Sequence, residues 1–106
     1  MSDSYNERLG KILRSIRKQR NNKNPGDFTL QALEPLVGAL QPYMSKVENG
    51  VANCSTSILI DWCKAIGVPP SVVLALAAYD ESKFTEIDKR MQSVAIAQLK
   101  KLGLKL

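Results

Sequence analysis

The chain has 106 residues and a formal charge of +5, and it contains no histidine. This length fits one domain, and the lack of histidine removes the usual general base and most zinc sites, so we expect neither an enzyme nor a metal or other cofactor. No apolar run approaches the roughly 18–20 residues that cross a bilayer, and the polar start lacks a signal core. We therefore expect a cytoplasmic protein with no membrane partner.

The first predicted helix is amphipathic. Leu9, Ile12, Leu13 and Ile16 follow the spacing of one apolar helix face. The other face is basic: Arg8, Lys11, Arg14, Arg17, Lys18 and Arg20. Such a surface suits either contact with a polyanion or a solvated basic helix. The turn-forming run 21–27 predicts the end of this helix.

Two short helices follow, and the residues at their ends define them. Thr29 is a good N-cap for the second helix, and Gly38 closes it as a glycine commonly does. A third helix is predicted over 41–48, with Asn49-Gly50 marking its end. Two helices joined by a turn of about four residues that starts with glycine form the pattern of a DNA-binding helix-turn-helix.

The remaining core helices have similar end signals. Ser55 is placed to cap a fourth helix that ends before Gly67, and Pro69-Pro70 introduces a fifth over about 71–78. Short connections between these helices predict a compact all-α bundle of five helices over residues 1–79. Cys54 and Cys63 do not have a metal or redox spacing, so we expect two ordinary buried or half-buried thiols.

The segment 80–106 is a separate helical tail. Its apolar residues step by three and four, as in a coiled-coil seam: Phe84, Ile87, Met91 and Val94. The seam predicts dimerisation through this helix, and the alternative is a final helix that packs back on its own domain. The fifth helix, with Val72, Val73 and Leu76, is a competing dimer surface.

A family resemblance rests on three features: Gly38, the run Ser45-Lys46-Val47-Glu48-Asn49-Gly50, and the turn Ala65–Val68. With them, the stretch 28–50 resembles the Cro/CI-type helix-turn-helix family, also called xenobiotic-response-element-like, of bacterial and phage regulators. Residues 9–17 and 55–68 resemble its first and fourth helices. The resemblance implies the lambda-repressor-like form of the five-helix bundle, followed here by a C-terminal helix.

The resemblance also implies DNA contacts. Base contacts are expected from one face of the third helix: Gln41, Pro42, Tyr43, Ser45 and Lys46. Gln41 suits adenine and Lys46 suits guanine, unless Gln41 and Ser45 are only solvated surface and Lys46 reaches only phosphate. The residues assigned to phosphate are Thr29, Gln31, Asn49, Arg17, Lys18, Arg20 and Lys23. Glu48 matches a position that often pairs with the first-helix arginine, here Arg17.

Four positions depart from the family pattern. Glu34 stands where a small residue is usual, Leu40 replaces a hydroxyl or glycine cap, and Leu30 replaces a glutamine. Pro35 falls inside the second helix, which should cost about 3 kcal/mol unless that helix kinks or begins later.

The expected function is a sequence-specific double-stranded DNA-binding transcriptional regulator, more often a repressor. As a homodimer it would read an inverted repeat with half-site centres about 34 Å apart. The alternative is an antitoxin-like or other interaction module that holds a protein partner through residues 80–106.

Overall fold

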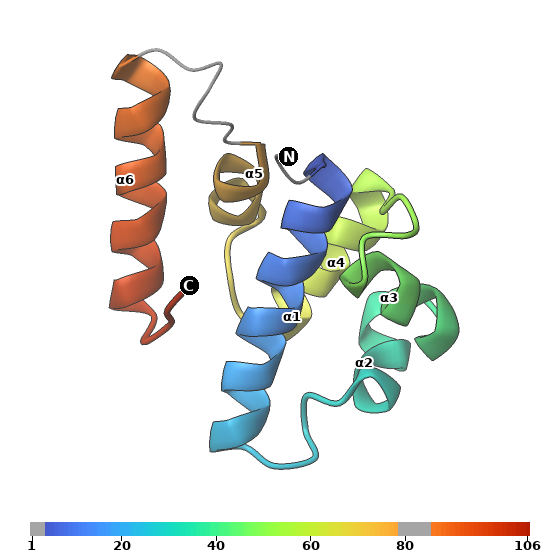
Figure 1. Cartoon of the computed structure of the whole chain (residues 1–106). Helices are drawn as coiled ribbons and strands as arrows, with labels where there is room; N and C mark the ends of the chain where they lie inside the picture. Colours follow the sequence, from blue (N-terminus) through green and yellow to red (C-terminus); the bar gives the residue numbers. More distant parts are fainter. Residues whose placement is uncertain (1–3, 79–85) are drawn as a thin grey trace.

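The computed structural model describes residues 4–78 and 86–106, except the side chains of Ile87 and Asp88. Within these residues the chain forms six helices and no strand (Figure 1). Their bounds are α1 Tyr5–Lys23, α2 Leu30–Val37, α3 Gln41–Glu48, α4 Thr56–Ile66, α5 Pro70–Ala78 and α6 Glu86–Lys101. The radius of gyration is 13.5 Å, close to the roughly 13 Å of a compact chain of this length. The expected all-α architecture of five helices and a C-terminal helix is confirmed.

The predicted helix ends of α2 and α4 are confirmed. The hydroxyl of Thr29 accepts a hydrogen bond from the Ala32 N–H at 3.1 Å, and that of Ser55 accepts one from the Ile58 N–H at 3.4 Å. Gly38 ends α2 with a φ of 73°, a left-handed conformation that glycine adopts without steric cost. Local sequence therefore fixes where these helices begin and end.

The predicted end of α1 is wrong by three residues. The run 21–27 was expected to be loop, but α1 continues to Lys23, and the loop to α2 covers 24–29. Asn21 has a helical backbone, and its side-chain oxygen bonds the backbone of the loop that follows. It accepts from the Gly26 and Phe28 N–H groups, both at 3.1 Å.

Pro35 is accommodated inside α2. The helix starts at Leu30, directly after its Thr29 cap, so it does not avoid the proline by starting later. The proline falls in the last turn of an eight-residue helix, and its side chain is exposed. The backbone hydrogen bond that proline cannot donate is therefore absent near the end of α2 and not in its middle.

The core takes buried side chains from every helix, and α1, α4 and α5 supply many of those that are fully buried. Leu13, Ile16, Trp62, Ile66 and Val73 are each 0% exposed. The three α5 residues that were considered as a dimer surface, Val72, Val73 and Leu76, are buried in this core. They have little surface left to offer to a second copy.

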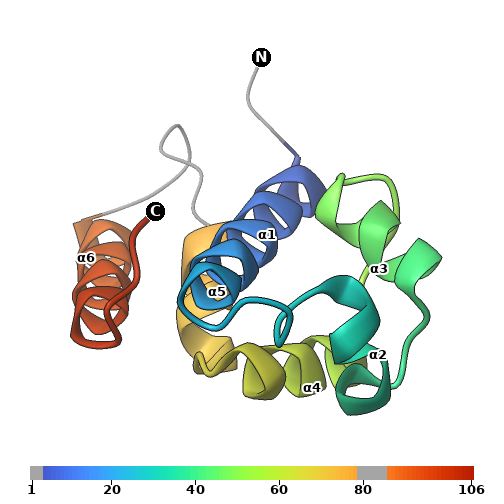
Figure 2. The same ribbon diagram turned by 90° about the horizontal axis from the view of Figure 1, so that it is seen from below.

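The tail helix α6 packs on α5, on the opposite side of the molecule from α2 and α3 (Figures 1 and 2). Ala95, Leu99 and Leu104 are buried there. The alternative of a helix packed back on its own domain is thus confirmed for this face. Of the predicted seam, Phe84 and the Ile87 side chain lie outside the described residues, as does the predicted boundary near residue 79. Met91 and Val94 are 57% and 53% exposed, so dimerisation through them stays a prediction.

Within the described residues, no single helix has the length and apolarity needed to cross a membrane. Only α4 and α5 taken together reach that length and apolarity, and they are bent by 116° at their junction.

Candidate nucleic-acid interface

The outward face of α3 brings together most of the predicted base-contacting residues. Gln41, Pro42 and Lys46 are exposed, and Ser45 is half-buried. Asn49, predicted to bind phosphate, follows the helix and is also exposed. Met44, Val47 and Glu48 occupy the opposite, buried face. The helix therefore presents amides, a hydroxyl and an ammonium group to solvent, with no carboxylate on that face.

Tyr43 is placed differently from the other base-contacting candidates. Its side chain is half-buried, and its hydroxyl donates to the Asn53 carbonyl at 2.6 Å. The bond links α3 to the loop 49–55 that follows it. Only the exposed part of the Tyr43 ring remains for a base, such as a thymine methyl.

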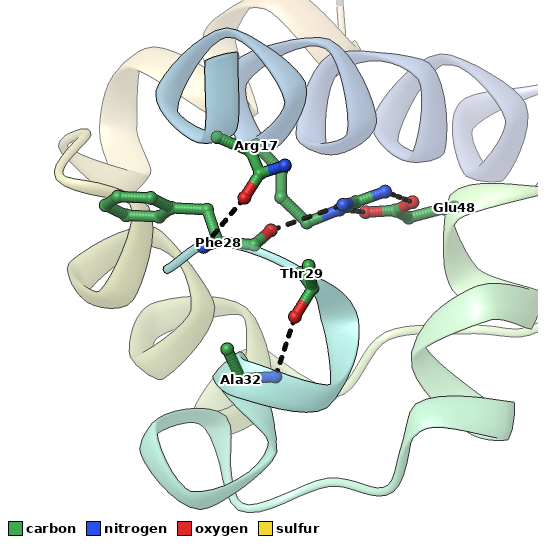
Figure 3. Close-up of polar contacts among 6 residues, drawn as sticks. Arg17, Phe28, Thr29, Ala32 and Glu48 are labelled. Carbon is green, nitrogen blue, oxygen red and sulfur yellow. Dashed lines mark hydrogen bonds and ion pairs between the residues drawn. The ribbon is translucent and has the colours of Figure 1, made fainter. Parts of the chain in front are cut away.

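A buried ion pair anchors α3 to α1 (Figure 3). The Arg17 guanidinium donates to both Glu48 carboxylate oxygens, at 2.7 Å from Nε and 2.9 Å from Nη2. A third bond runs from Arg17 Nη1 to the Phe28 carbonyl at 3.2 Å. Glu48 is 6% exposed, and a bidentate charge-assisted pair of this kind fixes orientation as well as distance. The pairing expected from the family resemblance is confirmed.

Close backbone approach is the second anchor of α3. A Cβ at Gly10 of α1 would clash with the Val47 carbonyl oxygen and would lie 2.6 Å from that of Glu48. The absence of a side chain at Gly10 therefore lets the end of α3 rest directly on α1. The sequence signal was available, because glycine inside an amphipathic helix often marks a packing requirement.

The first turn of α3 is capped from across the turn. Its N-cap residue is Leu40, which has no side-chain bond to offer, and the Glu34 carboxylate accepts from the Gln41 N–H at 2.6 Å. Of the two departures from the family pattern, Glu34 thus supplies the cap that Leu40 lacks. The negative charge also fits the positive end of the helix dipole.

The first turn of α2 offers a different environment. Thr29 caps this helix with its own hydroxyl (Figure 3), and no acidic residue lies in its first turn. Thr29 and Gln31 are both exposed. Because a helix N-terminus attracts anions, this end is better suited to a phosphate than the end of α3 already taken by Glu34.

The basic residues of α1 divide into two groups. Arg17 is engaged as described, and Arg20 donates to the Ile66 and Gly67 carbonyls, both at 3.0 Å. These two guanidinium groups hold the fold together, which disfavours the phosphate contacts predicted for them. Lys18 and Lys23 are exposed and keep that prediction.

Sequence reasoning underrated two further residues. Arg14 is exposed and lies on the stripe of α1 between Gly10 and Arg17, the two residues that contact α3. Val51 is 75% exposed directly after α3. The sequence placed Arg14 on the basic face without separating it from Arg17, and it gave no signal for Val51.

The acidic residues and the two cysteines are the remaining groups with metal-binding or nucleophilic chemistry. No cluster of three or more Cys, Asp or Glu with metal-binding geometry lies among them. Burial raises the pKa of Cys54 to about 11 and that of Cys63 to about 12, so both thiols are protonated at neutral pH. The expectation of buried and half-buried thiols is confirmed.

Comparison of the chain with protein-family models, with curated proteins and with solved structures finds no match.

Proposed function

We propose that the chain is a sequence-specific double-stranded DNA-binding protein of the Cro/CI type, with a lambda-repressor-like helix-turn-helix, and that α3 reads the major groove. The observation that carries this proposal is the asymmetry of α3. Its buried face is fixed to α1 by the Arg17–Glu48 pair and by the contact at Gly10. Its other face is exposed, polar and cationic.

The dimensions and chemistry of α3 support a reading role. Eight residues make a helix about 12 Å long, which suits a major groove about 12 Å wide. Gln41 can accept from and donate to adenine, and Lys46 can donate to guanine O6 and N7. Lys18, Lys23 and Arg14 add affinity through phosphates, which positions the protein without specifying a sequence.

Regulation of transcription follows from this binding mode. A homodimer would read an inverted repeat with half-site centres about 34 Å apart, and occupation of a promoter would exclude polymerase without any chemistry. The exposed apolar side chains of α6, Met91 and Val94, are the proposed dimer contacts. The same exposed residues support the second candidate, an antitoxin-like module that holds a protein partner.

The first experiment selects bound duplexes from a random DNA library at fixed salt. The wild type should enrich an inverted repeat, and the Gln41→Ala/Lys46→Ala variant should blur it at the bases those residues read. The matched control is Lys64→Ala, which removes an exposed lysine from α4 and should leave the motif intact. Retention without any enriched motif would contradict the proposal.

The salt dependence separates phosphate contacts from base contacts. Arg14→Ala and Lys18→Ala should weaken all sequences alike, and each lost phosphate contact should reduce the slope of log K against log salt by about 0.9. An altered sequence preference in either variant would assign that residue to base contact instead.

The dimer and the partner module are distinguished by Met91→Glu/Val94→Glu. In light scattering this variant should be monomeric where the wild type is dimeric, and it should bind single half-sites only. A wild type that is already monomeric would favour the partner module.

A further inference from the structure

A cavity of about 830 Å³ lies between α1, α5, α6 and the segment after α6, residues 102–106. We call it the tail cavity. Its lining includes residues of α6, and this helix lies on the opposite side of the molecule from α3 (Figures 1 and 2). Its volume falls within the range of about 300–1,000 Å³ typical of small-molecule sites. The proposed DNA contacts of α3 do not line it.

The walls of the tail cavity are apolar. The apolar residues are Ile12 of α1, Leu76 of α5, Ile96 and Leu99 of α6, and Leu104 and Leu106 after α6. A hydrocarbon chain would bury apolar surface against them on entering. Gln92 is the one uncharged polar side chain among the described residues of the lining.

The charged side chains among the described residues that line the tail cavity are all basic: Arg8, Lys11, Lys100 and Lys105. Arg8 is held in place by a bond from its Nε to the Ala77 carbonyl at 2.7 Å. Lys100 and Lys105 are exposed, so their ammonium groups can meet an anion at the mouth.

The C-terminal wall is fixed at one point. The Gln19 side chain accepts from the Lys105 N–H at 2.8 Å and donates to the Lys105 carbonyl at 2.5 Å. This pair of bonds holds the segment after α6 against α1. The cavity is therefore bounded by a tethered segment and not by a loose end.

We propose that the tail cavity binds one single-chain amphipathic carboxylate, with its hydrocarbon chain against the apolar wall and its head group near Lys100 and Lys105. A cationic amphiphile would face the four basic side chains of the lining, and a purely polar anion would leave the apolar wall unused. The ligand would join α6 more firmly to α1 and α5. This inference does not depend on DNA binding.

Calorimetry with dodecanoate, below its micelle-forming concentration and without DNA, tests the proposal. We expect one site per chain and an affinity that rises about fourfold for each methylene from octanoate to dodecanoate, because each methylene is buried. Dodecyltrimethylammonium, which has the same chain and the opposite charge, should bind at least tenfold more weakly. Equal binding of the two amphiphiles, or several equivalents per chain, would overturn the proposal.

Matched variants locate the site. Lys100→Glu should weaken dodecanoate about fivefold, whereas Lys101→Glu, the same charge change on the neighbouring exposed residue, should not. Ile96→Trp should fill the cavity and weaken binding at least tenfold. Its control is Ile60→Trp on α4, where the exposure is 38% against 40% for Ile96. Equal losses within either matched pair would overturn the assignment.

A final arm distinguishes a free amphiphile from a lipid surface. Amide hydrogen exchange in α6 should slow with dodecanoate and remain unchanged with phosphatidylglycerol vesicles. Slower exchange with vesicles alone would replace the proposed occupant by a membrane and overturn the proposal.

Discussion

Helix α1 meets α3 and the C-terminal part of the chain in different ways. Towards α3 it offers a bidentate ion pair and a backbone contact with no room for a methyl group. Towards the tail, α1 contributes Ile12 to the wall of a cavity, and Gln19 bonds the Lys105 backbone after α6. Helix α6 itself packs on α5. The first junction fixes the orientation of α3, whereas the second leaves space. A helix that must present its side chains to bases with a fixed geometry needs the first kind of contact. A helix that adapts to a bound ligand needs the second.

The largest expected effect comes from removing the acid of the buried pair. Glu48→Ala leaves the Arg17 guanidinium, with 12% of its side chain exposed, without its partner, and should cost about 3–5 kcal/mol. Urea unfolding followed by fluorescence suits this test, because Trp62 is the single tryptophan and is fully buried. Glu86→Ala, which breaks the exposed Lys89–Glu86 pair, is the control and should cost less than about 1 kcal/mol. A loss below about 1 kcal/mol for Glu48→Ala would remove the distinction between the two junctions.

The second effect sharpens the contrast on the tail side. Leu99→Ala truncates a side chain that is 2% exposed beside the tail cavity, and should cost about 2–3 kcal/mol, the lower part of the range for such changes. Hydrogen exchange should show lost protection in α6 while α1 and α4 stay protected. Leu13→Ala in the core should instead open the whole bundle. Similar exchange patterns for the two variants would mean that the tail and the core unfold as one unit.

The third effect tests the close approach of α1 and α3. Gly10→Ala forces the two backbones apart, which typically costs about 1–3 kcal/mol of stability. The higher helix propensity of alanine offsets about 0.5–1 kcal/mol of this loss. We expect a net loss of about 1–2 kcal/mol and weaker sequence-specific DNA binding. Arg14→Ala, on the exposed stripe of the same helix, is the stability control. A Gly10→Ala variant as stable as the wild type would show that the backbones of α1 and α3 can move apart by a methyl group without loss of stability.

The smallest effect concerns the cap of α3. Glu34→Ala removes the acceptor of the Gln41 N–H and should cost about 1 kcal/mol. Adding Leu40→Ser should recover most of that loss by supplying a local cap. Urea unfolding of the single and double variants measures both steps. If the double variant is no more stable than Glu34→Ala, a serine at position 40 does not replace the cap that Glu34 provides.

The sequence predicted the elements better than their mutual contacts. Thr29, Gly38, Ser55 and Gly67 mark helix ends by local chemistry, and all four lie where they were expected. The end of α1 was missed because Asn21 serves the following loop through its side chain while its backbone remains helical. Residue type alone does not separate these two uses of asparagine.

The candidate site was predicted in its outline and not in its details. Gln41, Pro42 and Lys46 lie on the exposed face of α3, as the resemblance implies, whereas Tyr43 and Ser45 are half-buried. Burial of Met44 and Val47 sets the direction of this face. Periodicity could not tell that Arg17 and Arg20 turn towards carboxylate and carbonyl groups while Lys18 stays in solvent. That division depends on partners distant in the chain. The family resemblance indicated Glu48 for Arg17, whereas nothing in the sequence indicated the carbonyl groups that Arg20 bonds.

The cap that Glu34 provides for α3 has an evolutionary consequence. The bond from the Gln41 N–H to Glu34 couples positions 34 and 40, since the glutamate supplies the cap that the Leu40 side chain cannot. In homologues of this chain the two positions should therefore vary together. A lineage that gains serine or threonine at 40 is released from the requirement for an acid at 34, and a small residue can return there. Substitution of either position alone should be rare among surviving sequences.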